Sequence, residues 1–192
     1  SLKCLLCYLS FLSLITHNTG LGHQMHKKVT SNIQSHPYDE LLLENGAKLI
    51  FTPCPGTKTE SLTESLSTLK KAGTTMLLTL MFDQEMGKHQ VHTLPAECKQ
   101  QGIDWIQLPI LDDAAPNHAF ESQWQIHKTN ILNVLNNQGV IAVHCKGGSG
   151  RTGLVIGLIL LALGWPKEKV MNAVQAIRPK ALINPQQLDY FN

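Results

Sequence analysis

The feature that most constrains this chain is a glycine-rich segment, HCKGGSGRTG, at residues 144–153. It follows the apolar run GVIAV and precedes a second apolar run, LVIGLILLALGW. A loop between a buried strand and a buried helix presents backbone N–H groups and the positive end of the helix dipole to whatever lies above it. The segment therefore predicts an anion site, and the loop either only holds the anion or also reacts with it.

Apolar runs alternate with helical patterns along the rest of the chain. Strands are predicted in TTMLLTLM (74–81), IDWIQLPI (103–110) and GVIAVHC (139–145), and helices over 59–73, 92–102, 119–139, 151–165, 166–179 and 184–192. Such alternation is typical of a mostly parallel sheet with helices on both faces, which binds ligands at the carboxyl ends of its strands. We therefore predict an α/β fold whose anion-binding loop lies between a central strand and a buried helix.

Two local signals refine this prediction near the start of the domain. Asn45-Gly46 stands between two apolar runs, and because both residues tolerate positive φ, the pair predicts a hairpin. Leu62, Leu66 and Leu69 recur at helical spacing in the segment 59–73. We expect Thr59 to cap this helix and Gly73 to end it.

Size and charge limit the classes of function. With 192 residues, of which 43% are hydrophobic and 16% charged, the chain fits one domain around a single sheet. Sixteen Lys and Arg against fourteen Asp and Glu leave a net charge of +2, too small to favour nucleic acid or a membrane surface as the main partner. An anion must therefore be held by local basic residues.

The first residues carry an apolar segment, KCLLCYLSFLSLI, as long as the core of a signal peptide but too short to span a bilayer. No small-x-small cleavage site follows it in THNTGLGHQ, and Met25 offers an alternative start. We expect an N-terminal extension over 1–35, a domain over 36–192, no stable membrane insertion and a cytoplasmic location. Export is the alternative if the apolar segment is a signal peptide.

The five cysteines are odd in number and lack the spacing of a disulfide framework, which favours a reducing compartment. Cys4 and Cys7 form a single CxxC with no second Cys or His pair at zinc-ligand spacing. We therefore expect them to be apolar members of their segment and expect no bound metal.

Two nucleotide-binding patterns compete for the glycine-rich segment. Residues 148–153 match GxGxxG, but that fingerprint needs an acidic residue about twenty positions on, after a second strand, where this chain has the helical KVMNAVQAIR. The phosphate loop of the Walker type would need glycine in place of Cys145 and lysine in place of Arg151. Both patterns are therefore disfavoured.

A third pattern, C-x5-R, uses Cys145 and Arg151. A short loop of this kind can wrap its N–H groups around one tetrahedral oxyanion while the guanidinium holds two of its oxygens. The thiol then lies beneath the phosphorus. A helix N-terminus and an adjacent arginine both favour the thiolate, so the cysteine can act as a nucleophile without a separate base.

HCKGGSGRTG resembles the signature H-C-x5-R-[ST]-G of the cysteine-dependent protein tyrosine and dual-specificity phosphatases. Similarity in order and spacing extends over about residues 40–192, in PCPGTK, LKKAGTTMLLTLM, LPILDDAAP and AIRPKALINPQQLDYF. These segments are similar to the cyclin-dependent-kinase-associated phosphatase branch. Residues 1 to about 35 lie outside the resemblance.

The resemblance implies that Cys145 attacks phosphorus and forms a phosphocysteine. The equatorial oxygens would be held by the Arg151 side chain and by the backbone N–H groups of the loop, namely those of Lys146, Gly147, Gly148, Ser149, Gly150 and Arg151. Thr152 would donate its hydroxyl to the sulfur, and His144 would fix the loop by hydrogen bonds. The alternative for His144 is a buried histidine with no catalytic role. No cofactor is implied.

The family's general acid comes from a D-x-x-x-P loop, which places it here at Asp112, with Asp113 as the rival. The alternative is that both are ordinary loop or cap residues. The family pattern also has a glutamine that positions the hydrolytic water, and this chain departs from it in INPQQ at 183–187. Whether Asn184, Gln186 or Gln187 replaces that glutamine is left open by the sequence.

The residues and the resemblance together predict a metal-free hydrolase of phosphotyrosine in proteins, with phosphoserine and phosphothreonine as open possibilities. Lys146 beside the nucleophile keeps a phosphoinositide phosphatase as the second enzyme class. A non-catalytic phosphoresidue-binding module is the third, although such modules usually lack the reactive residue that this chain retains.

Overall fold

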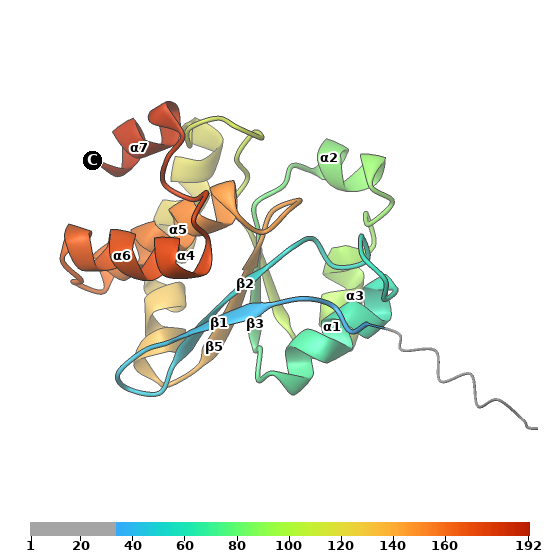
Figure 1. Cartoon of the computed structure of the whole chain (residues 1–192). Helices are drawn as coiled ribbons and strands as arrows, with labels where there is room; N and C mark the ends of the chain where they lie inside the picture. The colour runs from blue at the N-terminus through green and yellow to red at the C-terminus, as the bar shows by residue number, and fades with distance from the viewer. Residues whose placement is uncertain (1–33) are drawn as a thin grey trace, which may run out of the picture. The chain divides into compact units, whose positions relative to one another are not determined.

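The structure is a computed structural model that describes residues 34–192. Its elements in chain order are β1 (Asp39–Leu42), β2 (Lys48–Thr52), α1 (Leu62–Lys71), β3 (Met76–Thr79), α2 (Asp83–Lys88), α3 (Leu94–Gln100), β4 (Asp104–Gln107), α4 (His118–Asn136), β5 (Val140–His144), α5 (Gly150–Ala162), α6 (Lys167–Ile177) and α7 (Pro185–Phe191) (Figure 1).

The strands form one five-stranded sheet in the order β1-β2-β5-β3-β4. Strand β1 pairs antiparallel with β2, and every other pairing is parallel. Strand β5 is therefore central, and the glycine-rich loop leaves its carboxyl end before entering α5. The predicted α/β class, the mostly parallel sheet and the position of the loop are confirmed.

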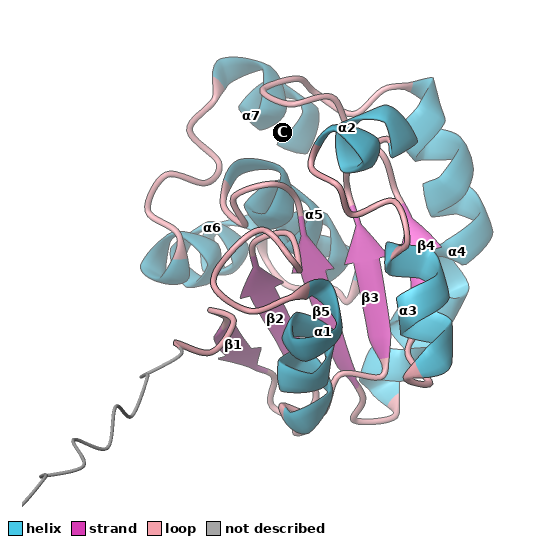
Figure 2. Ribbon diagram, turned by 90° about the vertical axis from the view of Figure 1, so that its right-hand side faces the viewer, coloured by secondary structure: helices cyan, strands magenta, loops and turns pink. Residues whose placement is uncertain are grey.

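Alternation along the central strands divides the core into two layers. Ile50, Leu77 and Ala142 face one side of the sheet, where they pack with apolar residues of α1 and α3. Their neighbours in sequence face the larger cluster on the other side, to which α4, α5, α6 and α7 contribute. Figure 2 shows α1 and α3 in front of the sheet and α5 behind it. Side chains alternate between the two faces while burial is nearly continuous along β2, β3 and β5, as a sheet covered on both faces requires.

The predicted hairpin is confirmed, because Asn45-Gly46 lies in the turn between β1 and β2. The predicted cap of α1 was wrong: Ser61 occupies the N-cap, where its hydroxyl accepts from the Glu64 N–H and the Glu64 carboxylate accepts from the Ser61 N–H. This reciprocal capping box satisfies two backbone donors, which Thr59 could not do with Leu62 three positions on. Helix α2 was not predicted.

Several expectations fall on residues 1–33 and lie outside the described residues: the apolar segment, the Cys4–Cys7 pair and the start at Met25. No helix within 34–192 is long and apolar enough to cross a membrane. In the same range, Cys54, Cys98 and Cys145 are buried free thiols, and no three His, Cys, Asp or Glu side chains gather as a metal site.

Candidate active site

The loop after β5 closes around the sulfur of Cys145, a residue only 4% exposed. Its Sγ accepts hydrogen bonds from the Gly148 N–H at 3.2 Å and from the Thr152 hydroxyl at 3.3 Å. Two donors aimed at one sulfur stabilise negative charge on it. The side chain of Ser149, the N-cap of α5, makes no capping hydrogen bond, so it does not occupy the first N–H groups of that helix.

The loop lies so close to β2 that one position requires glycine. Gly148 has φ +79°, and a Cβ there would lie 2.6 Å from the carbonyl carbon of Thr52. Arg178, just after α6, fastens the same turn: its Nε donates to the Gly148 carbonyl at 2.9 Å, while another guanidinium nitrogen is 2.6 Å from the Asp39 carboxylate. The sequence does not indicate this role of Arg178, because its partners are remote in the chain. It is a positioning residue for the loop.

Arg151 is held in place before any substrate arrives. Its side chain is only 1% exposed, and its two terminal nitrogens donate to the two carboxylate oxygens of Glu85 at 2.8 and 2.9 Å. One of them also donates to the Ile110 carbonyl at 3.0 Å. Burial works to lower the pKa of Arg151, but the hydrogen bonds to Glu85 and the charges of Cys145, Glu85 and Asp112 together outweigh it, so the pKa is raised. The guanidinium therefore stays charged and fixed.

One guanidinium donor is left over. The Nε atom of Arg151 is buried and has no hydrogen-bond partner within the described part of the chain. A buried N–H without an acceptor is costly and uncommon in native structures. An oxyanion seated in the loop is the acceptor that this donor fits.

Glu85 is a second residue of the site that the sequence did not indicate. It lies on α2, a helix of six residues that starts after Phe82 without a side-chain cap. Because α2 buries only Met86, it has no apolar periodicity to detect. The motif C-x5-R identifies the arginine but carries no signal for the carboxylate that orients it.

Asp112 and Asp113 differ in where they lie. The Asp112 carboxylate is 72% exposed and has an oxygen 3.4 Å from a terminal nitrogen of Arg151. Asp113 has φ +58°, and its N–H donates back to the Asp112 side chain at 3.1 Å. For the described residues, no hydrogen bond or ion pair joins the Asp113 carboxylate to the loop. Of the two candidates, the structure therefore brings Asp112 to Arg151 of the glycine-rich loop 145–151, which is called the phosphate loop below after the anion that it is expected to hold.

The start of α7 supports the segment that carries these aspartates. Asn184 donates to the Asp113 carbonyl at 3.3 Å, and Gln187 donates to the Ala114 carbonyl at 3.2 Å. Gln187 is buried, and its Oε1 would lie 3.8 Å from a Cβ placed on Gly150. Gln186 is exposed. Of the three candidates for the water-positioning glutamine, Gln187 lies between the two loops.

His144 is fully buried and satisfied on both ring nitrogens. Its Nδ1 is 3.0 Å from the Cys145 carbonyl, which can only accept, so the ring proton lies on Nδ1 and Nε2 accepts from the Thr79 hydroxyl at 2.7 Å. Trp105 in turn donates to the Thr79 oxygen at 2.8 Å. Burial lowers the pKa of His144 to about 4, so the ring is neutral near pH 7. These bonds fit the expected positioning role and give the ring no proton to exchange with substrate.

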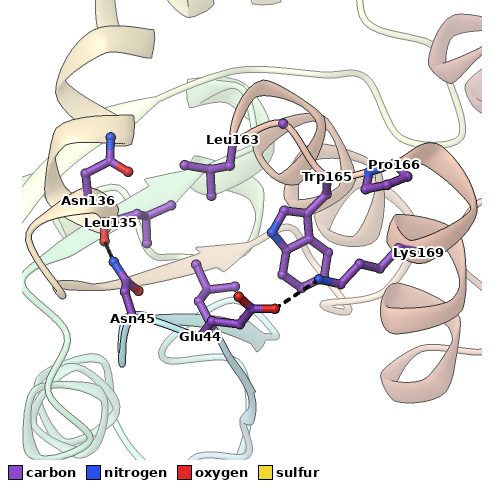
Figure 3. A pocket seen from close by; sticks show the side chains of 10 residues that line it. Glu44, Asn45, Leu135, Asn136, Leu163, Trp165, Pro166 and Lys169 are labelled. Atoms are coloured by element: carbon purple, nitrogen blue, oxygen red, sulfur yellow. Dashed lines mark hydrogen bonds and ion pairs between the residues drawn. The ribbon is translucent and has the colours of Figure 1, made fainter.

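A separate cavity of about 310 Å³ lies near the amino ends of β2 and β5, at the end of these strands opposite the phosphate loop. Figure 3 shows two interactions among its polar side chains: Lys169 pairs with Glu44 at 3.5 Å, and Asn45 donates to the Leu135 carbonyl at 2.9 Å. Lys169 also lies 3.9 Å from the centre of the Trp165 ring. The only Lys or Arg that lines this cavity is therefore paired, so the cavity offers no unpaired cation among residues 34–192 for binding phosphate.

A family model described as the DSP-PTPase phosphatase domain of the Swiss Army Knife proteins matches residues 54–187. The tyrosine-protein phosphatase CDC14 of Candida albicans is 42% identical over 55 residues, which cover 28% of this chain and 10% of that protein. The protein tyrosine phosphatase type IVA 2 of mouse is 30% identical over 126 residues, covering 57% of this chain and 70% of that protein.

The fold is similar to solved structures of phosphatases. The kinase associated phosphatase KAP, crystallised with its catalytic cysteine replaced by serine, superposes with a TM-score of 0.73 at 22% identity, covering 82% of this chain and 93% of that chain. PTPMT1 in complex with PI(5)P superposes with a TM-score of 0.57 at 20% identity, covering 74% of this chain and 86% of that chain. At these identities, the likeness concerns the fold.

Proposed function

This chain belongs to the family of cysteine-dependent protein tyrosine and dual-specificity phosphatases, and we propose on that basis that residues 36–192 are a catalytic domain that hydrolyses phosphotyrosine in proteins without a metal. The observation that carries the proposal is the pairing of a buried thiol with a buried, fixed guanidinium whose Nε has no acceptor within 34–192. A phosphoryl group bound above Cys145 would place an oxygen to accept a hydrogen bond from the Arg151 Nε and its phosphorus next to the Cys145 sulfur.

The reaction has two steps. In the first, the Cys145 thiolate attacks phosphorus, the S–P bond forms, and the P–O bond to the leaving group breaks as Asp112 protonates the departing oxygen. In the second, water attacks the phosphocysteine, Asp112 takes its proton, and the thiolate leaves with the Thr152 hydroxyl donating to it. Arg151 and the loop N–H groups stabilise the charge on the equatorial oxygens in both transition states.

The presence of Cys145 in the loop supports an enzyme over a non-catalytic binding module, because such a module needs only the groups that bind the phosphate. The three buried thiols of the described residues carry no disulfide. This supports the further proposal of a reducing, cytoplasmic compartment, in which phosphorylated proteins are the partners.

The substrate class is tested by comparing phosphotyrosine peptides with inositol phosphates. Family members that cleave phosphoinositides resemble this loop but have a second lysine, where this chain has Ser149. One charge-assisted hydrogen bond is worth roughly 1.5–3 kcal/mol, or about 10- to 150-fold. We therefore expect a higher kcat/KM for the peptides, measured as phosphate release in the presence of a chelator, and a smaller gap for Ser149→Lys.

The Cys145→Ser variant serves as the blank in that comparison. If the wild-type protein hydrolysed the inositol phosphates faster than the phosphotyrosine peptides, the proposal that its substrates are proteins would be wrong. The thiolate mechanism would be unaffected.

The general acid is tested by leaving-group dependence. Asp112→Asn should slow hydrolysis of esters with poor leaving groups by about 10²–10⁴, the usual contribution of a positioned acid, and should slow activated aryl esters less. Asp113→Asn is the matched control, and the position of its carboxylate predicts activity near wild type. The opposite ranking of the two variants in kcat would assign the acid to Asp113.

A further inference from the structure

A cavity of about 700 Å³ opens beside the proposed catalytic centre. Three segments line it: helix α2 with its C-cap His89, the segment that carries Asp112, and the phosphate loop. The lining residues are Gln84, Glu85, Lys88, His89, Leu111, Asp112 and Lys146. Because Glu85 and Asp112 also contact Arg151, and Lys146 follows Cys145 in the chain, the cavity lies next to the phosphate site.

Helix α2 has two roles at this place. Glu85, Lys88 and His89 are spaced i, i+3 and i+4, which puts them on one face of the helix. Glu85 uses its carboxylate on Arg151, so the same face turns Lys88 and His89 toward the cavity. The helix that orients the catalytic arginine thus also lines the approach to it.

The two lysines that line this cavity have no carboxylate partner in the part of the chain that the structure describes. Lys88 and Lys146 form no ion pair with any residue of 34–192, whereas Glu85 is occupied by Arg151. The carboxylate of Asp112 is also directed to Arg151, at 3.4 Å. Two ammonium groups therefore line the cavity without an ion-pair partner among residues 34–192.

Leu111 gives the cavity an apolar wall. This side chain is 58% exposed, although it lies between the buried Ile110 and the site residue Asp112. An exposed leucine beside two free lysines suits a peptide, whose side chains combine apolar stems with charged ends.

We propose that this cavity is a subsite for the carboxylate of an acidic residue next to the phosphotyrosine of a protein substrate. The inference rests on the proposed function and adds the sequence context of the substrate. A carboxylate fits better than a second phosphate, because Glu85 and Asp112 line the same cavity and repel a dianion more strongly than a monoanion.

The test uses two phosphotyrosine peptides that differ only in glutamate or glutamine beside the phosphotyrosine, with an aryl phosphate as the minimal substrate. Exposed charge pairs contribute little, so we expect the wild-type protein to prefer the glutamate peptide by about two- to fivefold in kcat/KM at low salt. Lys88→Gln should remove this preference by slowing only the glutamate peptide. Its rates for the glutamine peptide and the aryl phosphate should stay unchanged.

Lys99→Gln is the matched control, since Lys99 occupies the last turn of the short helix α3 as Lys88 does in α2, but does not line the cavity. It should keep the preference. Equal rates of the wild-type protein for both peptides, or equal slowing of both by Lys88→Gln, would overturn the proposal. A larger preference for a peptide with a second phosphate in place of glutamate would overturn the assignment to a carboxylate.

The same comparison, made as Kd values on the Cys145→Ser variant, separates the subsite from the proposed function. A glutamate preference in binding that Lys88→Gln abolishes supports the subsite whatever the turnover. Absence of turnover of the aryl phosphate by the wild-type protein would count against the proposed function alone.

Discussion

Cys145→Ser is expected to abolish turnover and to leave phosphate binding intact. Serine is a poor nucleophile without an adjacent base, and the buried His144 has both ring nitrogens engaged elsewhere. Loss of the nucleophile of a hydrolase costs on the order of 10⁶ in kcat. The cradle itself remains, because Arg151 and the loop N–H groups are unchanged.

Phosphate release from an aryl phosphate measures the loss, and calorimetric titration with inorganic phosphate measures the retained binding. Cys98→Ser is the control, because Cys98 is also a buried free thiol but lies on α3, in the other layer of the core. It should keep the wild-type rate. A wild-type rate in Cys145→Ser would exclude the covalent mechanism.

Arg151→Lys is expected to be nearly inactive although it keeps the positive charge. A lysine presents a point charge, whereas Arg151 reaches both oxygens of Glu85 and the Ile110 carbonyl and still has Nε free for substrate. Removing one preorganised donor to an oxyanion costs about 10²–10³ in kcat. We expect a loss of at least that size in kcat/KM for the aryl phosphate.

The Glu85→Gln variant tests whether the activity depends on how Glu85 orients the Arg151 guanidinium. If Glu85 acts by orienting Arg151, its substitution should cost activity in the wild-type background and much less in Arg151→Lys, so the two losses should not add. Additive losses would show that the carboxylate acts independently of the arginine. Thermal unfolding of each variant separates these effects from a loss of folded protein.

The features that could be predicted from the sequence are those that depend on residues close together in the chain. The phosphate loop was predictable because its residues are contiguous and its glycines, cysteine and arginine each have a defined part. The hairpin at Asn45-Gly46 depends on two adjacent residues. Helix α1 was found from its leucines, but its cap was misplaced by two residues because the pairing of Ser61 with Glu64 was overlooked.

The features that escaped prediction depend on contacts between distant segments. Glu85 meets Arg151 across 66 residues, and nothing in the sequence DQEMGK marks it as a partner. The choice between Asp112 and Asp113 depends on a backbone conformation, with φ +58° at Asp113, that spacing does not determine. The support of this segment by Gln187 needs the packing of α7, which forms only in the complete fold.

The phosphate site follows the central strand β5, so residues from distant parts of the chain must meet there before the site is formed. The groups that shape the loop meet across 65 residues for Thr79 and His144, 66 for Glu85 and Arg151, and 139 for Asp39 and Arg178. Contacts this remote form late, because the entropy of closing long loops must be overcome before they contribute. A nascent or partly unfolded chain therefore carries the signature residues without a formed anion cradle. The anion site therefore forms only when the sheet and the C-terminal helices have folded together.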